Sequence, residues 1–139
     1  MNTRPQIFTI LLALLCLVFT HPAIASGPSH LLDGKAFVGN NGEKGQPLDP
    51  DEDEEIIFKN GMFHSVSCDP YNFGSSPYSA KQVGNTIHYE AETMSPSHGK
   101  IAWKGVVEGN TAEVNFVWTK ERWYWDTRRE YWFRGTLKE

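Results

Sequence analysis

Two histidines and one cysteine are the side chains that could catalyse a reaction or bind a metal ion. His64 and Cys68 lie on one segment and His88 on another, with no third ligand at the spacing of a zinc site. A cysteine followed by Asp69 and a proline matches no nucleophile motif, and no carboxylate pair or catalytic triad emerges. The sequence therefore predicts no catalytic residue, no metal ion and no cofactor, and a protein that is not an enzyme.

A run of acidic residues provides the other candidate metal ligands. Asp49, Asp51 and Asp53 have the spacing that opens a calcium-binding loop. The glycine that such a loop requires at its sixth position is Glu54 here, and the glutamate at its twelfth is Asn60. We therefore expect a solvated acidic loop rather than a calcium site.

Large aromatic side chains are the remaining candidates for a binding site. They can either fill a core or line a cavity for a small apolar or aromatic ligand, and the sequence leaves both interpretations open. The candidate ligand-binding residues are Tyr89, Trp103, Phe116, Trp118, Trp123, Trp125 and Tyr131.

The segment 122–129 combines three consecutive rings, Trp123 to Trp125, with three arginines. Three adjacent rings cannot all point into one core, so some of them must reach solvent or fold over the end of the structure. Aromatic and arginine side chains together are typical of protein-binding hot spots. Two interpretations remain open: a recognition loop for a protein partner, or the structural end of a hairpin.

Alternating apolar residues predict the antiparallel strands that would position these side chains. Asn60-Gly61, Gly84-Asn85 and Gly109-Asn110 each separate two alternating runs, and these residue types suit two-residue hairpin turns. Around the first of these turns, we expect Phe58 and Phe63 to share the inner face.

The last of these turns also predicts which tryptophans are inside. Its register places Trp103 beside Phe116, with Trp118 on the same face. We therefore expect Trp103 and Trp118 inside the fold, and Trp123 and Trp125 at its rim.

The predicted fold is all-β: an eight-stranded antiparallel up-and-down meander closed as a small barrel. Every connection is local, no window has a helical period, and the aromatic loop 69–77 is long enough to close one end. The interior of such a barrel is just wide enough to be packed by side chains or to hold one small ligand. The strands are expected near residues 35–39, 55–59, 62–68, 78–83, 86–93, 100–108, 111–120 and 129–137.

The N-terminus has the pattern of a secretory signal peptide. Arg4 precedes an apolar run over residues 7–19, and small residues at Ala23 and Ala25 suit cleavage after residue 25. The run is shorter than the roughly 20 residues that a spanning helix needs. We therefore predict a signal peptide at 1–25, a single barrel domain at 26–139, export to the periplasm or the extracellular space, and no stable membrane anchor.

Cys68 is the only cysteine that remains after this cleavage, so no intramolecular disulfide is predicted. Either the thiol is buried and unreactive, or it offers a route to intermolecular pairing. The formal net charge of −4, without basic clusters, argues against nucleic acid or anionic lipid as the main partner.

A meander of this kind that opens with the segment 32–37, Leu-Asp-Gly-Lys-Ala-Phe, and ends in a basic, aromatic strand resembles the calycin group, the lipocalins and their relatives. Where the first strand of lipocalins carries Gly-x-Trp, this chain has Gly34, Lys35, Ala36 and Phe37. The chain looks most like the small bacterial lipocalin-like periplasmic proteins. The resemblance implies ligand binding in the barrel or at its mouth.

The sequence thus suggests a non-enzymatic binding protein for a small apolar or aromatic ligand. The alternative is a packed barrel that acts as a protein interaction or inhibitor module through the aromatic loop 122–129. A cavity of at least roughly 300 Å³ with a mouth would favour the first hypothesis. A filled interior beneath an exposed aromatic patch would favour the second.

Overall fold

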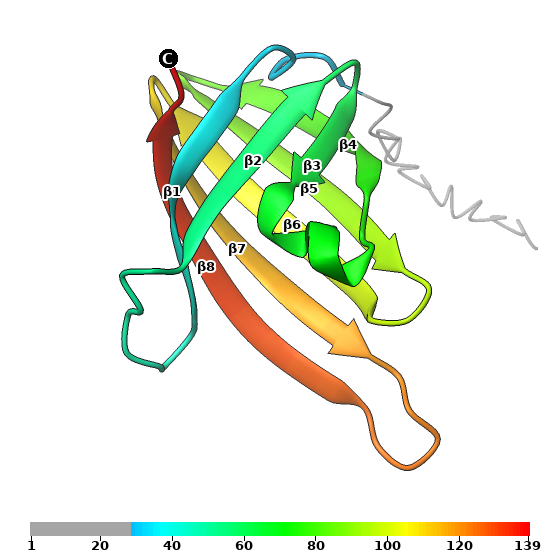
Figure 1. Ribbon diagram of the computed structural model, residues 1–139. Helices are drawn as coiled ribbons and strands as arrows, with labels where there is room; N and C mark the ends of the chain where they lie inside the picture. Colours follow the sequence, from blue (N-terminus) through cyan, green and yellow to red (C-terminus); the bar gives the residue numbers. More distant parts are fainter. Residues whose placement is uncertain (1–28) are drawn as a thin grey trace, which may run out of the picture.

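A computed structural model describes residues 29–139 of the chain. The eight strands follow one another around a closed antiparallel barrel, and the first strand pairs with the last (Figure 1). The all-β meander barrel predicted from the sequence is confirmed. The predicted signal peptide, 1–25, lies outside the described residues.

The strand bounds agree with the prediction except around residues 40–50, 66–68 and 75. The elements are β1 (Ala36–Glu43), β2 (Asp53–Lys59), β3 (Met62–Ser65), the 3-10 helix η1 (Val66–Tyr71), β4 (Ser75–Val83), β5 (Thr86–Ser95), β6 (Gly99–Glu108), β7 (Thr111–Lys120) and β8 (Thr127–Leu137).

Two strand ends were predicted wrongly. The strand expected over 62–68 ends at Ser65 and is followed by η1, where Pro70 lacks the N–H that a strand would donate. The loop expected from Asn40 begins later, because β1 continues to Glu43 alongside β8. Gly42 permits this pairing, since a Cβ there would lie 2.9 Å from the Trp132 ring.

The hairpin turns have the geometry that the sequence predicts. Asn60 and Gly61 have φ angles of 54° and 74°, as a type I′ turn requires. Gly84 and Gly109 have φ angles of 60° and 56° at the first turn position. The predicted registers follow: Phe58 faces Phe63, and likewise Trp103 faces Phe116.

Aromatic rings fill the interior of the barrel. Phe58 contacts Tyr89 with ring centroids 4.8 Å apart, and Phe63 contacts Trp103 at 4.9 Å. Trp103 is only 1% exposed, and its indole N–H donates to the Thr93 hydroxyl at 2.9 Å. Phe58 and Phe63 therefore do face inward, as expected.

One end of the barrel is sealed by the segment that precedes β1. Leu32 is completely buried there, and its N–H donates to the Tyr78 hydroxyl at 3.0 Å. That hydroxyl donates to Asp33 at 2.8 Å, and Asp33 also accepts the N–H of Gly61 at 3.0 Å. Burial and the hydrogen bond to Asp33 raise the pKa of Tyr78 to about 12. The opposite end carries η1 and the β7–β8 loop (Figure 1).

Truncating a tryptophan should destabilise the protein if the residue is in the core but not if it is at the rim. Trp103→Ala should lower the free energy of unfolding by about 3 to 5 kcal/mol, because it leaves a cavity among packed rings. Trp123→Ala should change it by less than about 0.5 kcal/mol, because that side chain is exposed. Urea denaturation followed by circular dichroism measures both. An equal loss for the two variants would show that the loop around Trp123 supports the core.

Candidate functional site

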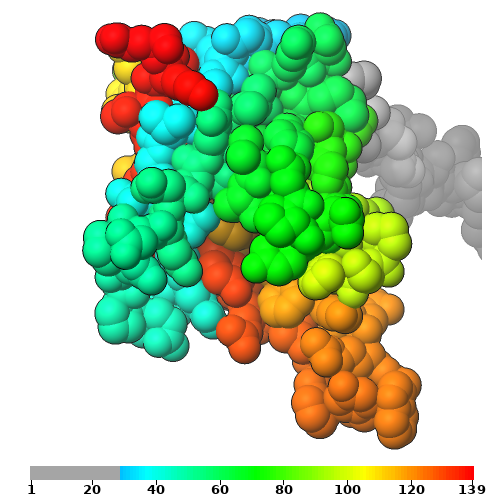
Figure 2. Space-filling view, in the orientation of Figure 1, coloured from blue at the N-terminus to red at the C-terminus, as the bar shows by residue number. Residues whose placement is uncertain are grey.

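A cavity of about 340 Å³ lies at the open end of the barrel. In the space-filling view, the surface is hollowed between the green atoms of η1 and the orange-red atoms of β8 (Figure 2). The apolar part of its lining comes from Cys68, Tyr71, Phe73, Ile101, Phe116, Trp118 and Tyr131, and the polar part from Asn41, Glu52, Ser67 and His98.

Strands β7 and β8 supply the aromatic wall of this cavity. Phe116 faces Tyr131 across the two strands, and their rings are stacked with centroids 5.2 Å apart. Phe116 also stacks on Trp103 at 4.3 Å, so a continuous column of rings leads from the core to the mouth. Trp118 lies two residues further along β7, half-buried, and its indole N–H donates to the carbonyl oxygen of His98 at 2.6 Å.

Helix η1 covers the other side of the cavity. The Ser95 hydroxyl donates to the carbonyl oxygen of Tyr71 at 2.6 Å, which attaches η1 to the β5–β6 turn. The Tyr71 ring lies 5.3 Å from the ring of His98. The prediction that the loop 69–77 closes one end is thus correct for η1 and Phe73, which is buried, although β4 already begins at Ser75 to pair with His64.

A buried carboxylate lies behind the cavity wall. Glu54 is only 3% exposed and accepts hydrogen bonds from the hydroxyl of Ser65 at 2.8 Å and the N–H of Ser67 at 3.2 Å. The Ser67 hydroxyl and the Asn41 amide also donate to it. The expectation that the whole acidic run is solvated is therefore wrong for Glu54. Strand β2 begins at Asp53, so its alternation turns Glu54 inward.

The charges around the cavity act on two of its lining groups. Burial raises the pKa of the Cys68 thiol, and the negative charge of Glu54 raises it further. Burial also raises the pKa of Tyr131, and the neighbouring Glu43 adds to this effect. Glu43 itself is paired with Arg129 at 3.3 Å. The cavity therefore combines aromatic walls with nearby negative charge.

The predicted site residues fall into three groups. Phe116, Trp118 and Tyr131 line the cavity together. Tyr89 and Trp103 are fully buried in the core beneath it. Trp123 and Trp125 are 95% and 65% exposed in the β7–β8 loop, which projects beyond the barrel (Figure 1).

The remaining lining residues were not predicted from the sequence. Ser67 and Tyr71 belong to η1, which the sequence analysis assigned to a strand and a loop. The proline within Val66–Tyr71 was the one signal that could have ended the strand earlier.

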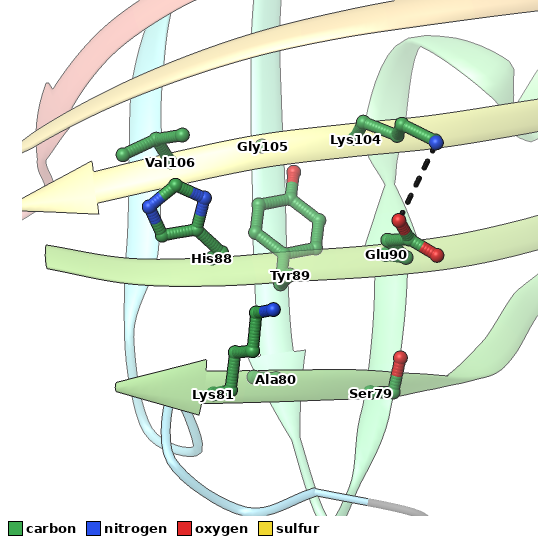
Figure 3. Close-up of a pocket in the computed structure, with 9 residues that line it drawn as sticks. All are labelled: Ser79, Ala80, Lys81, His88, Tyr89, Glu90, Lys104, Gly105 and Val106. Carbon is green, nitrogen blue, oxygen red and sulfur yellow. Dashed lines mark ion pairs between the residues drawn. The ribbon is translucent and has the colours of Figure 1, made fainter. Parts of the chain in front are cut away.

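A second hollow, of about 320 Å³, lies across β4, β5 and β6 (Figure 3). Charged side chains border it, and Lys104 pairs with Glu90 at 3.4 Å. The Tyr89 ring covers Gly105, where a Cβ would lie 2.1 Å from the ring. Because charged and polar side chains make up much of its border, this hollow offers less apolar surface to a ligand than the cavity at the mouth.

The histidines considered as metal ligands do not meet. His64 pairs with Asp69 at 3.1 Å, and His88 borders the hollow across β4 to β6. Within residues 29–139, no three histidine, cysteine or acidic side chains lie close enough together to hold a metal ion.

Comparison with known proteins gives no match, whether with protein-family models, curated proteins or solved structures. In the described part of the chain, no helix is long and apolar enough to span a membrane.

The environment of Cys68 predicts slow thiol chemistry. Because burial raises its pKa, the thiolate should be scarce at neutral pH, and alkylation by iodoacetamide should be at least about tenfold slower than in urea-unfolded protein. Mass spectrometry of the labelled protein measures the rate, which should rise with pH. Equal rates for folded and unfolded protein at neutral pH would contradict this assignment.

Proposed function

We propose that this protein binds a small apolar or aromatic ligand at the mouth of its barrel, without catalysing a reaction. The observation that carries the proposal is the cavity of about 340 Å³ that Phe116, Trp118 and Tyr131 line at the open end. Ligand sites are typically concave, largely apolar and about 300 to 1,000 Å³ in volume. A site at the mouth is also what the resemblance to the lipocalins implies.

The packing of the interior limits where a ligand can bind. The rings around Trp103 fill the sealed half of the barrel. The interior therefore would not enclose the whole ligand, as the interior of a wide hollow barrel does. It would instead extend the column of stacked rings that ends at Tyr131. The N-terminal pattern predicts export to the periplasm or the extracellular space. The protein would then meet its ligand outside the cytoplasm.

Loss of an aromatic wall residue should weaken binding without unfolding the protein. The neutral dye N-phenyl-1-naphthylamine should bind the wild-type protein with increased fluorescence, because the cavity is apolar. Trp118→Ala should weaken this binding by about tenfold, the effect of losing one aromatic contact. Trp123→Ala, which removes an equally large ring outside the cavity, should bind the dye like the wild type. Equal affinities of the Trp118 and Trp123 variants would exclude the mouth cavity as the site.

A second candidate function rests on the exposed loop 122–129. The Tyr124 ring contacts those of Trp123 and Trp125, with centroids 5.0 Å and 4.3 Å apart, and the Arg122 side chain donates to the Tyr124 hydroxyl at 3.3 Å. Exposed rings beside an arginine are typical of protein-binding surfaces. We infer that such a partner would be a protein with an acidic surface, because Arg122 has no ion-pair partner among the described residues.

Site-specific cross-linking tests this second function. A photo-reactive phenylalanine analogue at position 123 should give one discrete adduct with another protein, and Arg122→Glu should abolish that adduct by charge repulsion. The same analogue at position 83, where an exposed valine lies at the opposite end of the barrel, is the control and should give none. An adduct that survives Arg122→Glu, or forms equally from position 83, would count against an acidic partner.

A further inference from the structure

We propose that the ligand of the mouth cavity carries a positively charged amine next to its apolar or aromatic part. This inference rests on the proposed function, because it specifies the chemistry of the molecule that occupies the same cavity. It comes from the charges around the cavity rather than from its shape.

The buried carboxylate of Glu54 has only neutral hydrogen-bond donors. Its donors are two hydroxyls, one amide and one backbone N–H, from Ser65, Ser67 and Asn41, and all of them are neutral. No lysine, arginine or histidine of residues 29–139 forms an ion pair with Glu54. A buried charge is usually paired with an opposite charge, because hydrogen bonds alone compensate its lost hydration only in part. A cationic ligand would supply the missing charge.

Glu54 lies close to the cavity, because two of its hydrogen-bond donors line it. Asn41 and Ser67, which donate to its carboxylate, are themselves part of the cavity lining. The carboxylate therefore lies one hydrogen bond away from two residues of the cavity lining, although Glu54 itself lines a different hollow, of about 520 Å³, with Val38 and Val66. Its charge reaches the lining, since it contributes to the raised pKa of the Cys68 thiol.

The other charged side chains at the cavity also favour a cation over an anion. Glu52 lines the mouth directly. Arg129, the cation that acts on the lining residue Tyr131, is already paired with Glu43, and the pKa of Tyr131 is raised by burial first and then by Glu43. Among the described residues that line the cavity there is thus one carboxylate and no arginine or lysine, so the lining disfavours an anionic ligand.

The aromatic wall of the cavity also favours a cation. The face of an aromatic ring carries partial negative charge and attracts ammonium groups. Tyr131 ends the ring column and Trp118 is half-buried beside it, so both can offer ring surface to a ligand in the cavity.

A purely structural role for Glu54 is the competing explanation. Its hydrogen bonds to Ser65 and Ser67 attach the start of η1 to β2, and that alone could account for its burial. The two explanations differ in one measurable quantity, the preference for charged over neutral ligands. A structural role would change the affinities for both kinds of ligand together.

Three ligands with the same indole ring test the proposal: tryptamine, a cation; tryptophol, a neutral alcohol; and indole-3-propionate, an anion. Isothermal titration calorimetry with wild-type protein should show that tryptamine binds at least about tenfold more tightly than tryptophol, and that indole-3-propionate binds most weakly. Glu54→Gln, which keeps the shape of the side chain, should reduce the tryptamine affinity to that of tryptophol and leave the tryptophol affinity unchanged. Glu92→Gln removes an exposed carboxylate on β5 and should alter none of the three affinities.

The outcomes separate this inference from the proposed function. If tryptophol or indole-3-propionate binds the wild type as tightly as tryptamine, the amine proposal is wrong while the ligand site stands. If none of the three binds, both proposals fail. Should Glu54→Gln not fold, as its thermal unfolding would reveal, Glu52→Gln and the wild-type ligand series still decide the question. A loss of tryptamine and tryptophol affinity by equal factors in Glu54→Gln would assign Glu54 a structural role only.

Discussion

Closure of β8 onto β1 is the constraint on which the rest of the structure depends. Gly39 faces Gly135 across this seam, and a Cβ at Gly39 would lie 2.0 Å from the carbonyl oxygen of Arg134. A side chain at position 39 would therefore push the first and last strands apart. Because the seam closes, the barrel has no unpaired edge, and all inward side chains must share one interior of limited volume.

That limited volume explains why the two ends of the barrel differ. At the sealed end, Leu32 and the rings around Phe58 occupy the space completely. Towards the mouth, the inward positions hold smaller or polar side chains, among them Ser65 and Glu54, and β3 stops early in favour of η1. The cavity therefore arises where the aromatic wall of β7 and β8 faces the small or polar side chains of Asn41, Ser67 and Cys68.

The sequence predicts the regular part of this molecule well and the irregular part poorly. Two-residue turns at Asn60-Gly61 and Gly109-Asn110 determine registers directly, so the pairing of Trp103 with Phe116 could be derived by counting. Phe116 and Trp118 of the cavity wall were among the candidates for the same reason, and Tyr131 because it opens a further alternating run. Helix η1 could not be derived, because the alternation of residues 62–68 also suits a strand.

Glu54 shows most clearly why the site was harder to predict than the fold. Within an acidic run, its residue type indicates solvent exposure, and only the exact start of β2 decides that it points inward with Ile56 and Phe58. An apolar side chain at position 54 would continue that inner face and avoid the cost of a buried charge, which neutral donors offset only in part. A sequence shaped by stability alone would favour that replacement, and conflicts of this kind between local rules and the observed residue are expected at functional sites. The buried carboxylate is such a conflict, and either the proposed ligand at the mouth of the barrel or a structural role through the hydrogen bonds to Ser65 and Ser67 would account for it.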